Sequence, residues 1–301
     1  VTLGTGADDV DITNGGALNG DIDLGSGNNT LDVGAGSTIN GNITAGDGDD
    51  TVVIDGAVNG NIDLGLGNNS LTNNSNNSIN GDVIFNGTGI FTNNGTITGQ
   101  ITIGAGASFV NNGTLTGVVL LTDGDDTYTI TGSVSGVVLG LAGADTITGS
   151  AGDDTINGGQ GSDLLSGNDG DDNLTGGAGD DVIFGGSGLD DIFDGLGSDM
   201  LTGGADADIF IIEQEIASGA GTTDTILDFE DDVDTLDLSA FGFADQAAAI
   251  ATATDIDTNG DEVADSTLFT LTTGGADTQD LVVEGILSAD LQNDIDVGEI
   301  V

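Results

Sequence analysis

Eight aspartates recur at every ninth position in the middle of the chain, and this spacing is the strongest chemical signal in the sequence. They are Asp145, Asp154, Asp163, Asp172, Asp181, Asp190, Asp199 and Asp208. A carboxylate is a preferred ligand of calcium, a hard cation that takes about six to eight oxygens. One Asp among glycines is ordinarily a turn residue. Eight in unbroken register predict a row of cation sites.

The residues around each aspartate predict the elements that must position it. A glycine opens seven of the eight nine-residue copies, and an apolar residue always stands two positions after the Asp. These apolar residues are Ile147, Ile156, Leu165, Leu174, Ile183, Ile192, Leu201 and Phe210. Short strands joined by glycine turns cannot bury an apolar face alone, so successive coils must stack.

If two copies form one coil, the aspartates alternate between two edges of the stack. We expect Asp145, Asp163, Asp181 and Asp199 along one edge, and Asp154, Asp172, Asp190 and Asp208 along the other. Neighbouring carboxylates would then lie one strand spacing apart, about 4.8 Å, and would repel each other. The segment is therefore expected to fold only with divalent metal between its rungs.

The best copies, 158–166 (GGQGSDLLS) and 176–184 (GGAGDDVIF), resemble the RTX nonapeptide repeat G-G-x-G-x-D-x-U-x. The resemblance covers residues 140–211. It implies a parallel β-roll with several Ca²⁺ ions held in the turns by backbone carbonyls and by the eight aspartates. It also implies export by type I secretion. The chain is similar in this respect to RTX-containing surface-layer and extracellular matrix proteins.

Residues 1–139 carry a longer repeat of about 18–21 residues, which predicts a β-solenoid of about seven coils. An apolar residue, a small polar residue and Gly recur, as at 18–20 (LNG) and 39–41 (ING). Stacking these coils brings four asparagines into register, either as a hydrogen-bonded amide ladder or as ordinary turn residues. They are Asn19, Asn40, Asn59 and Asn80.

Residues 1–139 also contain weaker matches to the nonapeptide, which suggest a few more calcium ligands. The candidates are Asp8, Asp50 and Asp126. In other coils the equivalent position is predicted to hold Asn29, Asn69 and Ser108. We therefore expect only some coils of this half to bind calcium.

Residues 212–301 resemble the segment that follows RTX repeats, which implies a small β cap and a type I secretion region. The resemblance rests on 224–229 (DTILDF) and 234–239 (DTLDLS). An EF-hand-like start adds the candidate ligands Asp255, Asp257, Asn259 and Asp261. Its twelfth position is Ser266 instead of Glu, so this stretch is either a calcium site or a solvated acidic loop.

Together these patterns predict an all-β protein. A parallel β-solenoid (β-helix) over 1–139 would continue into a calcium β-roll over 140–211, followed by a C-terminal β capping region over 212–301.

The composition excludes several functions. The 301 residues include 52 Asp and Glu but no Lys, Arg, His or Cys, and the formal net charge is −52. Nucleic acids and anionic membranes are bound chiefly through Lys and Arg, so we expect neither partner and no membrane insertion. The chain also lacks a histidine base, a cysteine nucleophile and cationic oxyanion donors, so we expect no enzyme activity.

These expectations favour an extracellular or cell-surface structural protein that assembles with itself into a filament, matrix or surface layer. The first coil has no evident polar cap, and an open strand edge can be extended head to tail by a second copy. One alternative is an adhesin stalk that binds a cell-surface polysaccharide. Another is the C-terminal calcium-binding and secretion module of a larger secreted enzyme.

Overall fold

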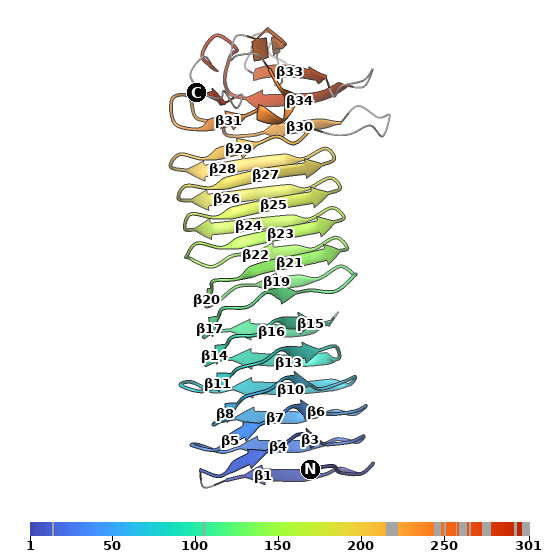
Figure 1. The fold of residues 1–301 in the computed structure, drawn as a ribbon. Coiled ribbons are helices and arrows are strands. Elements are labelled where there is room, and N and C mark those ends of the chain that lie inside the picture. The colour runs from blue at the N-terminus through green and yellow to red at the C-terminus, as the bar shows by residue number, and fades with distance from the viewer. Residues whose placement is uncertain are drawn as a thin grey trace. The chain divides into compact units, whose positions relative to one another are not determined.

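A computed structural model describes residues 1–13, 15–104, 106–214, 222–243, 248–249, 251–256, 258, 264, 266–272, 278–291 and 294–296. The chain divides into two compact units, Val1–Leu141 and Ala142–Val301. Both are nearly all-β, and each is a parallel β-solenoid in which strands pair with the equivalent strands of the next coil (Figure 1). Among the described residues, no helix is long and apolar enough to cross a membrane.

The first unit is three-sided, because each coil contributes one short strand to each of three parallel sheets. The first sheet orders β1 (Asp9–Ile12), β4 (Thr30–Val33), β7 (Thr51–Ile54), β10 (Asn68–Asn73), β13 (Thr88–Asn93) and β16 (Ala107–Asn111). The second orders β2 (Ala17–Asn19), β5 (Thr38–Asn40), β8 (Ala57–Val58), β11 (Ser78–Ile79), β14 (Thr96–Ile97), β17 (Thr114–Leu115) and β20 (Ser133–Val134). The third orders β3 (Ile22–Asp23), β6 (Ile43–Thr44), β9 (Ile62–Asp63), β12 (Val83–Phe85), β15 (Ile101–Ile103), β18 (Val119–Leu120) and β21 (Val137–Ala142). The short strand β19 (Thr127–Thr129) also belongs to this part of the chain.

Apolar side chains stacked in register fill much of the interior of the first unit. Aromatic rings form one stack, with centroids 5.9 Å apart for Phe85 and Phe91 and 4.6 Å apart for Phe91 and Phe109. Leu71, Phe91 and Phe109 are register partners on β10, β13 and β16. The period of the sequence therefore equals the length of a coil, and each interior position repeats its neighbour.

Of the two alternatives for the four asparagines, the amide ladder is the one present on the surface of the first unit. Asn40, Asn59 and Asn80 each donate a hydrogen bond from Nδ2 to Oδ1 of the preceding asparagine, at 2.7, 2.8 and 2.8 Å. A second amide ladder, which the sequence analysis did not anticipate, lies in the interior. Asn73 donates to Asn93 and Asn93 donates to Asn111, both at 2.7 Å, and all three side chains are fully buried.

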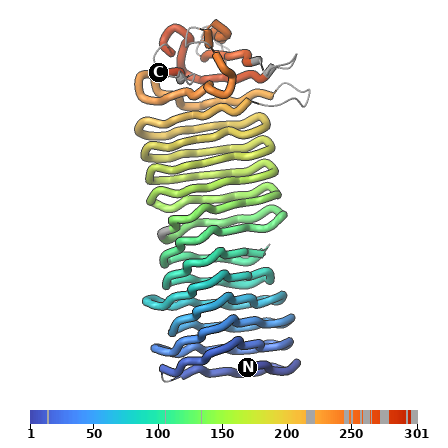
Figure 2. Tube along the Cα trace, viewed as in Figure 1, coloured from blue at the N-terminus to red at the C-terminus, as the bar shows by residue number. Residues whose placement is uncertain are grey.

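The second unit begins with flattened, two-sided coils, which the trace in Figure 2 shows between residues 142 and 212. One sheet orders β23 (Thr155–Gln160), β25 (Asn173–Ala178), β27 (Asp191–Leu196), β29 (Ile209–Ile211), β31 (Thr235–Asp237) and β35 (Ile295–Asp296). The other orders β22 (Thr146–Thr148), β24 (Leu164–Asp169), β26 (Val182–Ser187), β28 (Met200–Ala205), β30 (Thr223–Ile226), β34 (Thr278–Glu284), β33 (Ser266–Thr272) and β32 (Ala253–Ile256). A single 3₁₀ turn, Ser239–Phe241, is also described.

The eight predicted apolar residues form the core of these coils, and all of them have an exposed fraction of 0%. Leu165, Ile183 and Leu201 are register partners along one sheet, as are Leu174, Ile192 and Phe210 along the other. After β30 the pattern changes, because β34 pairs parallel to β30 but antiparallel to β33. The parallel stack of this sheet thus ends in an antiparallel hairpin.

Candidate metal centres

The eight position-six aspartates form two rows, as the nine-residue spacing predicts. The first Asp row consists of Asp145, Asp163, Asp181 and Asp199, and the second of Asp154, Asp172, Asp190 and Asp208. The first three residues of each row donate their backbone N–H to Oδ1 of the next aspartate in the row, at 2.7–3.0 Å. All eight side chains are buried, with exposed fractions of 1–3%.

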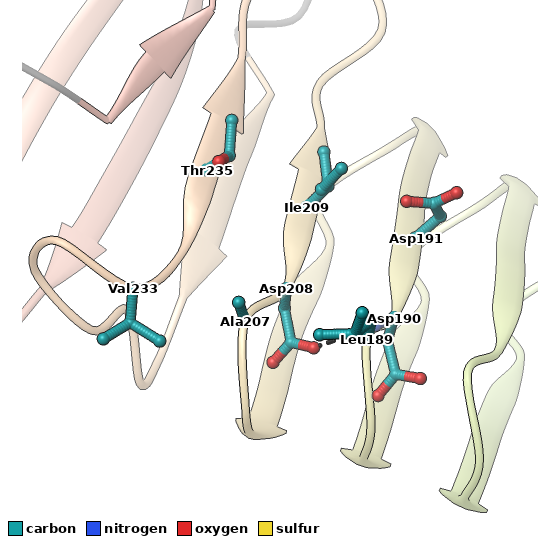
Figure 3. Close-up of a pocket in the computed structure, with 8 residues that line it drawn as sticks. All are labelled: Leu189, Asp190, Asp191, Ala207, Asp208, Ile209, Val233 and Thr235. Carbon is teal, nitrogen blue, oxygen red and sulfur yellow. Dashed lines mark hydrogen bonds between the residues drawn. The ribbon is translucent and has the colours of Figure 1, made fainter.

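The two carboxylate oxygens of a row aspartate therefore have different environments. Oδ1 accepts a hydrogen bond from the preceding coil, whereas Oδ2 is buried without a hydrogen-bond partner in Asp163, Asp172, Asp181, Asp190, Asp199 and Asp208. A buried, unpartnered carboxylate oxygen is costly unless a cation or proton neutralises it. Figure 3 shows Asp190 and Asp208, from successive coils, with their carboxylates on the same side, while Asp191 points away.

Beside the free oxygens of Asp163, Asp172, Asp181, Asp190 and Asp208, the repeat glycine leaves the position of a Cβ unfilled. A Cβ placed on Gly176 would lie under 3.0 Å from both Oδ2 of Asp181 and the carbonyl oxygen of Asp194 in the next coil. The same holds at Gly185, between Oδ2 of Asp190 and the carbonyl oxygen of Gly203. Carboxylate and carbonyl oxygens thus converge where a side chain would otherwise stand, and a hard cation prefers this set of donors.

Burial raises the pKa of the carboxyls of Asp154, Asp163, Asp172, Asp181, Asp190, Asp199 and Asp208. The pKa rises from an ordinary value of 3.8 to about 7 in Asp172, Asp181 and Asp208, and to about 8 in Asp199. Removal of the carboxylate from water is the main cause, and neighbouring carboxylates in the row add to it. Without a cation these carboxyls therefore favour the protonated form, although each accepts a backbone N–H that lowers its pKa.

Both rows continue beyond the repeats through residues that the sequence analysis did not assign as ligands. Asp199 donates its N–H to Oδ1 of Asp224 at 3.1 Å, and Asp208 donates to Oδ1 of Asp234 at 3.0 Å. The signal was present in the sequence, because 224–226 (DTI) and 234–236 (DTL) repeat the Asp-x-apolar pattern of the nonapeptide. Asp224 and Asp234 do not follow the nine-residue spacing of the repeats, so the spacing did not identify them as ligands.

A surface pocket of about 240 Å³ lies against the second Asp row, and Figure 3 shows its lining. Asp190 and Asp208 line it together with Leu189, Ile209 and Val233. These three apolar side chains are exposed, with fractions of 38–56%.

The candidates in the first unit form a mixed row. Asp8 donates its N–H to Oδ1 of Asn29, Asn29 to Asp50, and Asp50 to Asn69, at 2.8–3.1 Å. Oδ2 of Asp8 and Oδ2 of Asp50 are buried without a hydrogen-bond partner. Asparagine alternates with aspartate, so carboxylates do not face one another in successive coils.

Ser108 was wrongly predicted to continue this row. Asn69 pairs with Gly89 and Gly89 with Ala107, so the equivalent position is Ala107. Ser108 lies one residue further along β16 and is exposed, because adjacent residues of a strand face opposite sides.

Asp126, a candidate of the first unit, and Asp154 of the second Asp row differ from the aspartates with a free oxygen, because local donors occupy the Oδ2 of both. Oδ2 of Asp126 accepts hydrogen bonds from the backbone and the hydroxyl of Thr122, both at 2.9 Å. Oδ2 of Asp154 accepts hydrogen bonds from the backbone and the hydroxyl of Ser150, at 2.7 and 3.1 Å.

Of the EF-hand-like candidates, Asp255 lies on β32 and accepts an N–H from Ser288. Asp257, Asn259 and Asp261 lie outside the described residues.

Comparison with known families supports this geometry. The model of the RTX calcium-binding nonapeptide repeat matches the chain at residues 131–165, 157–192, 166–201 and 184–211. Residues 131–211 are RTX repeats. RTX nonapeptide repeats bind calcium and are typical of secreted proteins, and calcium is the cation that suits the row of converging oxygens. The resemblance inferred from the nine-residue spacing is thus confirmed.

Two solved structures are similar to the RTX-containing chain. One is the AlgE6R3 subunit of the Azotobacter vinelandii mannuronan C5-epimerase, with 24% identity, a TM-score of 0.35, and coverage of 58% of this chain and 80% of that chain. The other is the extracellular lipase LipA of Serratia marcescens, with 16% identity and a TM-score of 0.23. The alignment covers 91% of this chain but only 39% of the lipase. A search of curated proteins gave no significant match.

Proposed function

We propose that this protein is an extracellular structural protein whose second unit is held together by calcium ions bound between successive coils. The observation that carries the proposal is the buried, unpartnered Oδ2 of Asp163, Asp172, Asp181 and Asp190, which in each case faces a carbonyl oxygen of the next coil across the Cβ position of a glycine. Calcium placed there would bridge the coils and neutralise the rows.

The charge of the chain supports the same proposal. With a formal net charge of −52 and no Lys, Arg or His, no side chain can neutralise a buried carboxylate. External cations are the remaining source of positive charge. Secretion would deliver the chain to an environment that is rich in calcium, and this fits the typical location of RTX proteins.

A structural role is favoured over catalysis by the side chains that the sequence contains. RTX repeats are typically non-catalytic, and the chain offers no histidine, cysteine, lysine or arginine for acid–base, nucleophilic or oxyanion chemistry. We propose that residues 212–301 cap the roll and carry the type I secretion signal. The antiparallel hairpin of β33 and β34 supports the capping role, because it ends the parallel pairing of its sheet.

Calcium titration tests the proposal. Without calcium, the far-ultraviolet circular dichroism signal of the second unit should be lost, and added calcium should restore it. Gly176→Ala should raise the calcium concentration at the midpoint several-fold, because its Cβ fills the space beside Asp181. Gly152→Ala is the matched control, since nothing lies within 4 Å of its Cβ. An unchanged spectrum after chelation, or equal midpoints for the two variants, would contradict the proposal.

We also propose that the folded protein associates with itself. The outward face of the sheet formed by β24, β26 and β28 supports this, because Leu164, Val182 and Met200 are register partners on it. Leu164 and Met200 are 41% and 44% exposed, and the nearby Phe184 is 40% exposed. Sedimentation velocity and electron microscopy in millimolar calcium should reveal oligomers or fibres. Monomers at all concentrations would reject self-assembly while leaving the calcium role intact.

A further inference from the structure

Asp194 departs from the nonapeptide pattern at its first position, where the other seven copies have glycine. This is the position whose Cβ would enter the space beside the free carboxylate oxygen, as at Gly176 and Gly185. The Asp194 side chain is fully buried, with an exposed fraction of 0%. A carboxylate in such a place strongly destabilises a fold unless it is neutralised or coordinates a metal.

The two oxygens of Asp194 are held differently. Oδ1 accepts hydrogen bonds from the backbone N–H groups of Gly195 at 2.6 Å and Glu213 at 2.8 Å. Oδ2 is buried and has no hydrogen-bond partner. The hydrogen bonds therefore fix the orientation of the carboxylate and leave one oxygen available to a ligand.

Two further carboxylates lie close to that of Asp194. One oxygen from each of Asp194, Asp199 and Asp224 lies within 4.8 Å of the other two, and all three residues are buried. Oδ1 of Asp199 accepts an N–H from Asp181, and its Oδ2 has no hydrogen-bond partner. Asp224 is oriented from both sides, by the N–H of Asp199 at 3.1 Å and by Nε2 of the buried Gln279 at 2.8 Å.

This spacing suits one cation. Calcium binds oxygen at about 2.3–2.6 Å, so two of its ligands can lie up to about 5 Å apart on opposite sides of the ion. Three carboxylate oxygens within 4.8 Å of one another can therefore contact the same ion. The unpartnered oxygens of Asp194 and Asp199 supply an observation that is independent of the clustering of acids.

We infer that Asp194, Asp199 and Asp224 form a three-carboxylate calcium site, in which Asp194 adds a third carboxylate to two neighbours of the first Asp row. It rests on the proposed calcium dependence and goes beyond it, because it assigns a ligand outside the position-six aspartates. The site joins the seventh nonapeptide to β30 through Asp224 and to β34 through Gln279. It binds calcium more tightly than a regular position, since affinity rises with the number of charged ligands.

Asp194→Asn tests the inference, because Asn keeps an oxygen for the N–H groups of Gly195 and Glu213 but removes the charge. Equilibrium dialysis of the whole chain should show the loss of one tight calcium site, with an affinity there reduced about tenfold or more. Asp169→Asn, which removes one exposed charge from β24, is the matched control and should keep the wild-type stoichiometry. Equal tight binding by wild type and Asp194→Asn would overturn the inference.

Two further measurements keep the test decisive if Asp194→Asn does not fold. Asp194→Gly restores the glycine of the other copies and should fold with one tight site fewer. Anomalous diffraction from wild-type crystals with terbium should show an ion among the three carboxylates, and an empty position would overturn the inference. If wild type binds calcium and folds while the Asp194 variants match it, only this site is rejected. If wild type binds no calcium, the proposed function fails as well.

Discussion

In six of the row aspartates, the two carboxylate oxygens perform separate tasks. Oδ1 of Asp181 accepts the N–H of Asp163 at 2.8 Å, which joins two coils, while Oδ2 has no hydrogen-bond partner. Asn29 and Asn69 show that an amide can perform the first task, since their Oδ1 atoms accept the N–H groups of Asp8 and Asp50. The charge on the aspartates is therefore not needed for coil pairing, and this separates a ligand role from a structural one.

The pKa shifts predict how the metal-free protein responds to pH. The pKa of Asp172, Asp181 and Asp208 is raised to about 7 by burial, so the folded state without metal binds more protons than the unfolded chain between about pH 4 and 7. Its stability should be greatest near pH 4 and should fall as the pH rises through 7. Thermal melting in metal-free buffer, followed by circular dichroism, measures this.

Bound calcium should flatten this pH dependence, because it displaces protons from the same oxygens. The apparent calcium affinity of the folded protein should be lower at pH 6 than at pH 8, as isothermal titration calorimetry would measure. Metal-free stability that increases from pH 5 to pH 8 would show that the buried carboxyls are not the titrating groups.

At the scale of the element, the first unit uses asparagine ladders in two environments. The ladder through Asn59 is exposed, so water can replace each lost hydrogen bond. The ladder through Asn93 is fully buried, and removal of its middle member leaves the amide of Asn73 and the carbonyl oxygen of Asn111 without this partner. A buried polar group without a partner costs about 1–3 kcal/mol.

Asn93→Ala should therefore lower the free energy of unfolding by about 2–4 kcal/mol, since two buried groups lose their partner. Asn59→Ala removes the same amide from the exposed ladder and should cost less than about 1 kcal/mol. Urea unfolding in saturating calcium compares the two variants. Similar losses for both would mean that burial does not determine the contribution of a ladder.

At the scale of the whole molecule, the two units distribute their negative charge differently. In the row that contains Asp8 and Asp50, asparagines separate the aspartates, whereas both rows of the second unit present a carboxylate at every coil. Repulsion between neighbouring carboxylates is thus concentrated in the second unit. Its folding should depend on calcium more strongly than that of the first unit.

Hydrogen exchange after chelation tests this difference. Amides of β24 to β28 should lose protection, while amides of β7, β10 and β13 should retain it. Sodium chloride at about 1 M is the control, because it screens charges but does not ligate the rows. Protection restored by sodium chloride alone would indicate that screening, and not calcium coordination, stabilises the roll.

The sequence by itself determined the repeating part of this protein. Because one coil equals two nine-residue copies, a residue such as Asp181 or Ile183 has an equivalent residue 18 positions away in the next coil, and the spacing alone predicted the two Asp rows and the core. The tertiary structure decided what the period does not encode. Asp194, Asp224 and Gln279 come together although they are far apart in the sequence, because β30 and β34 extend the sheet after the repeat ends. The interior Asn73 ladder was missed for a related reason, since the side of the coil that an asparagine faces depends on where each strand turns.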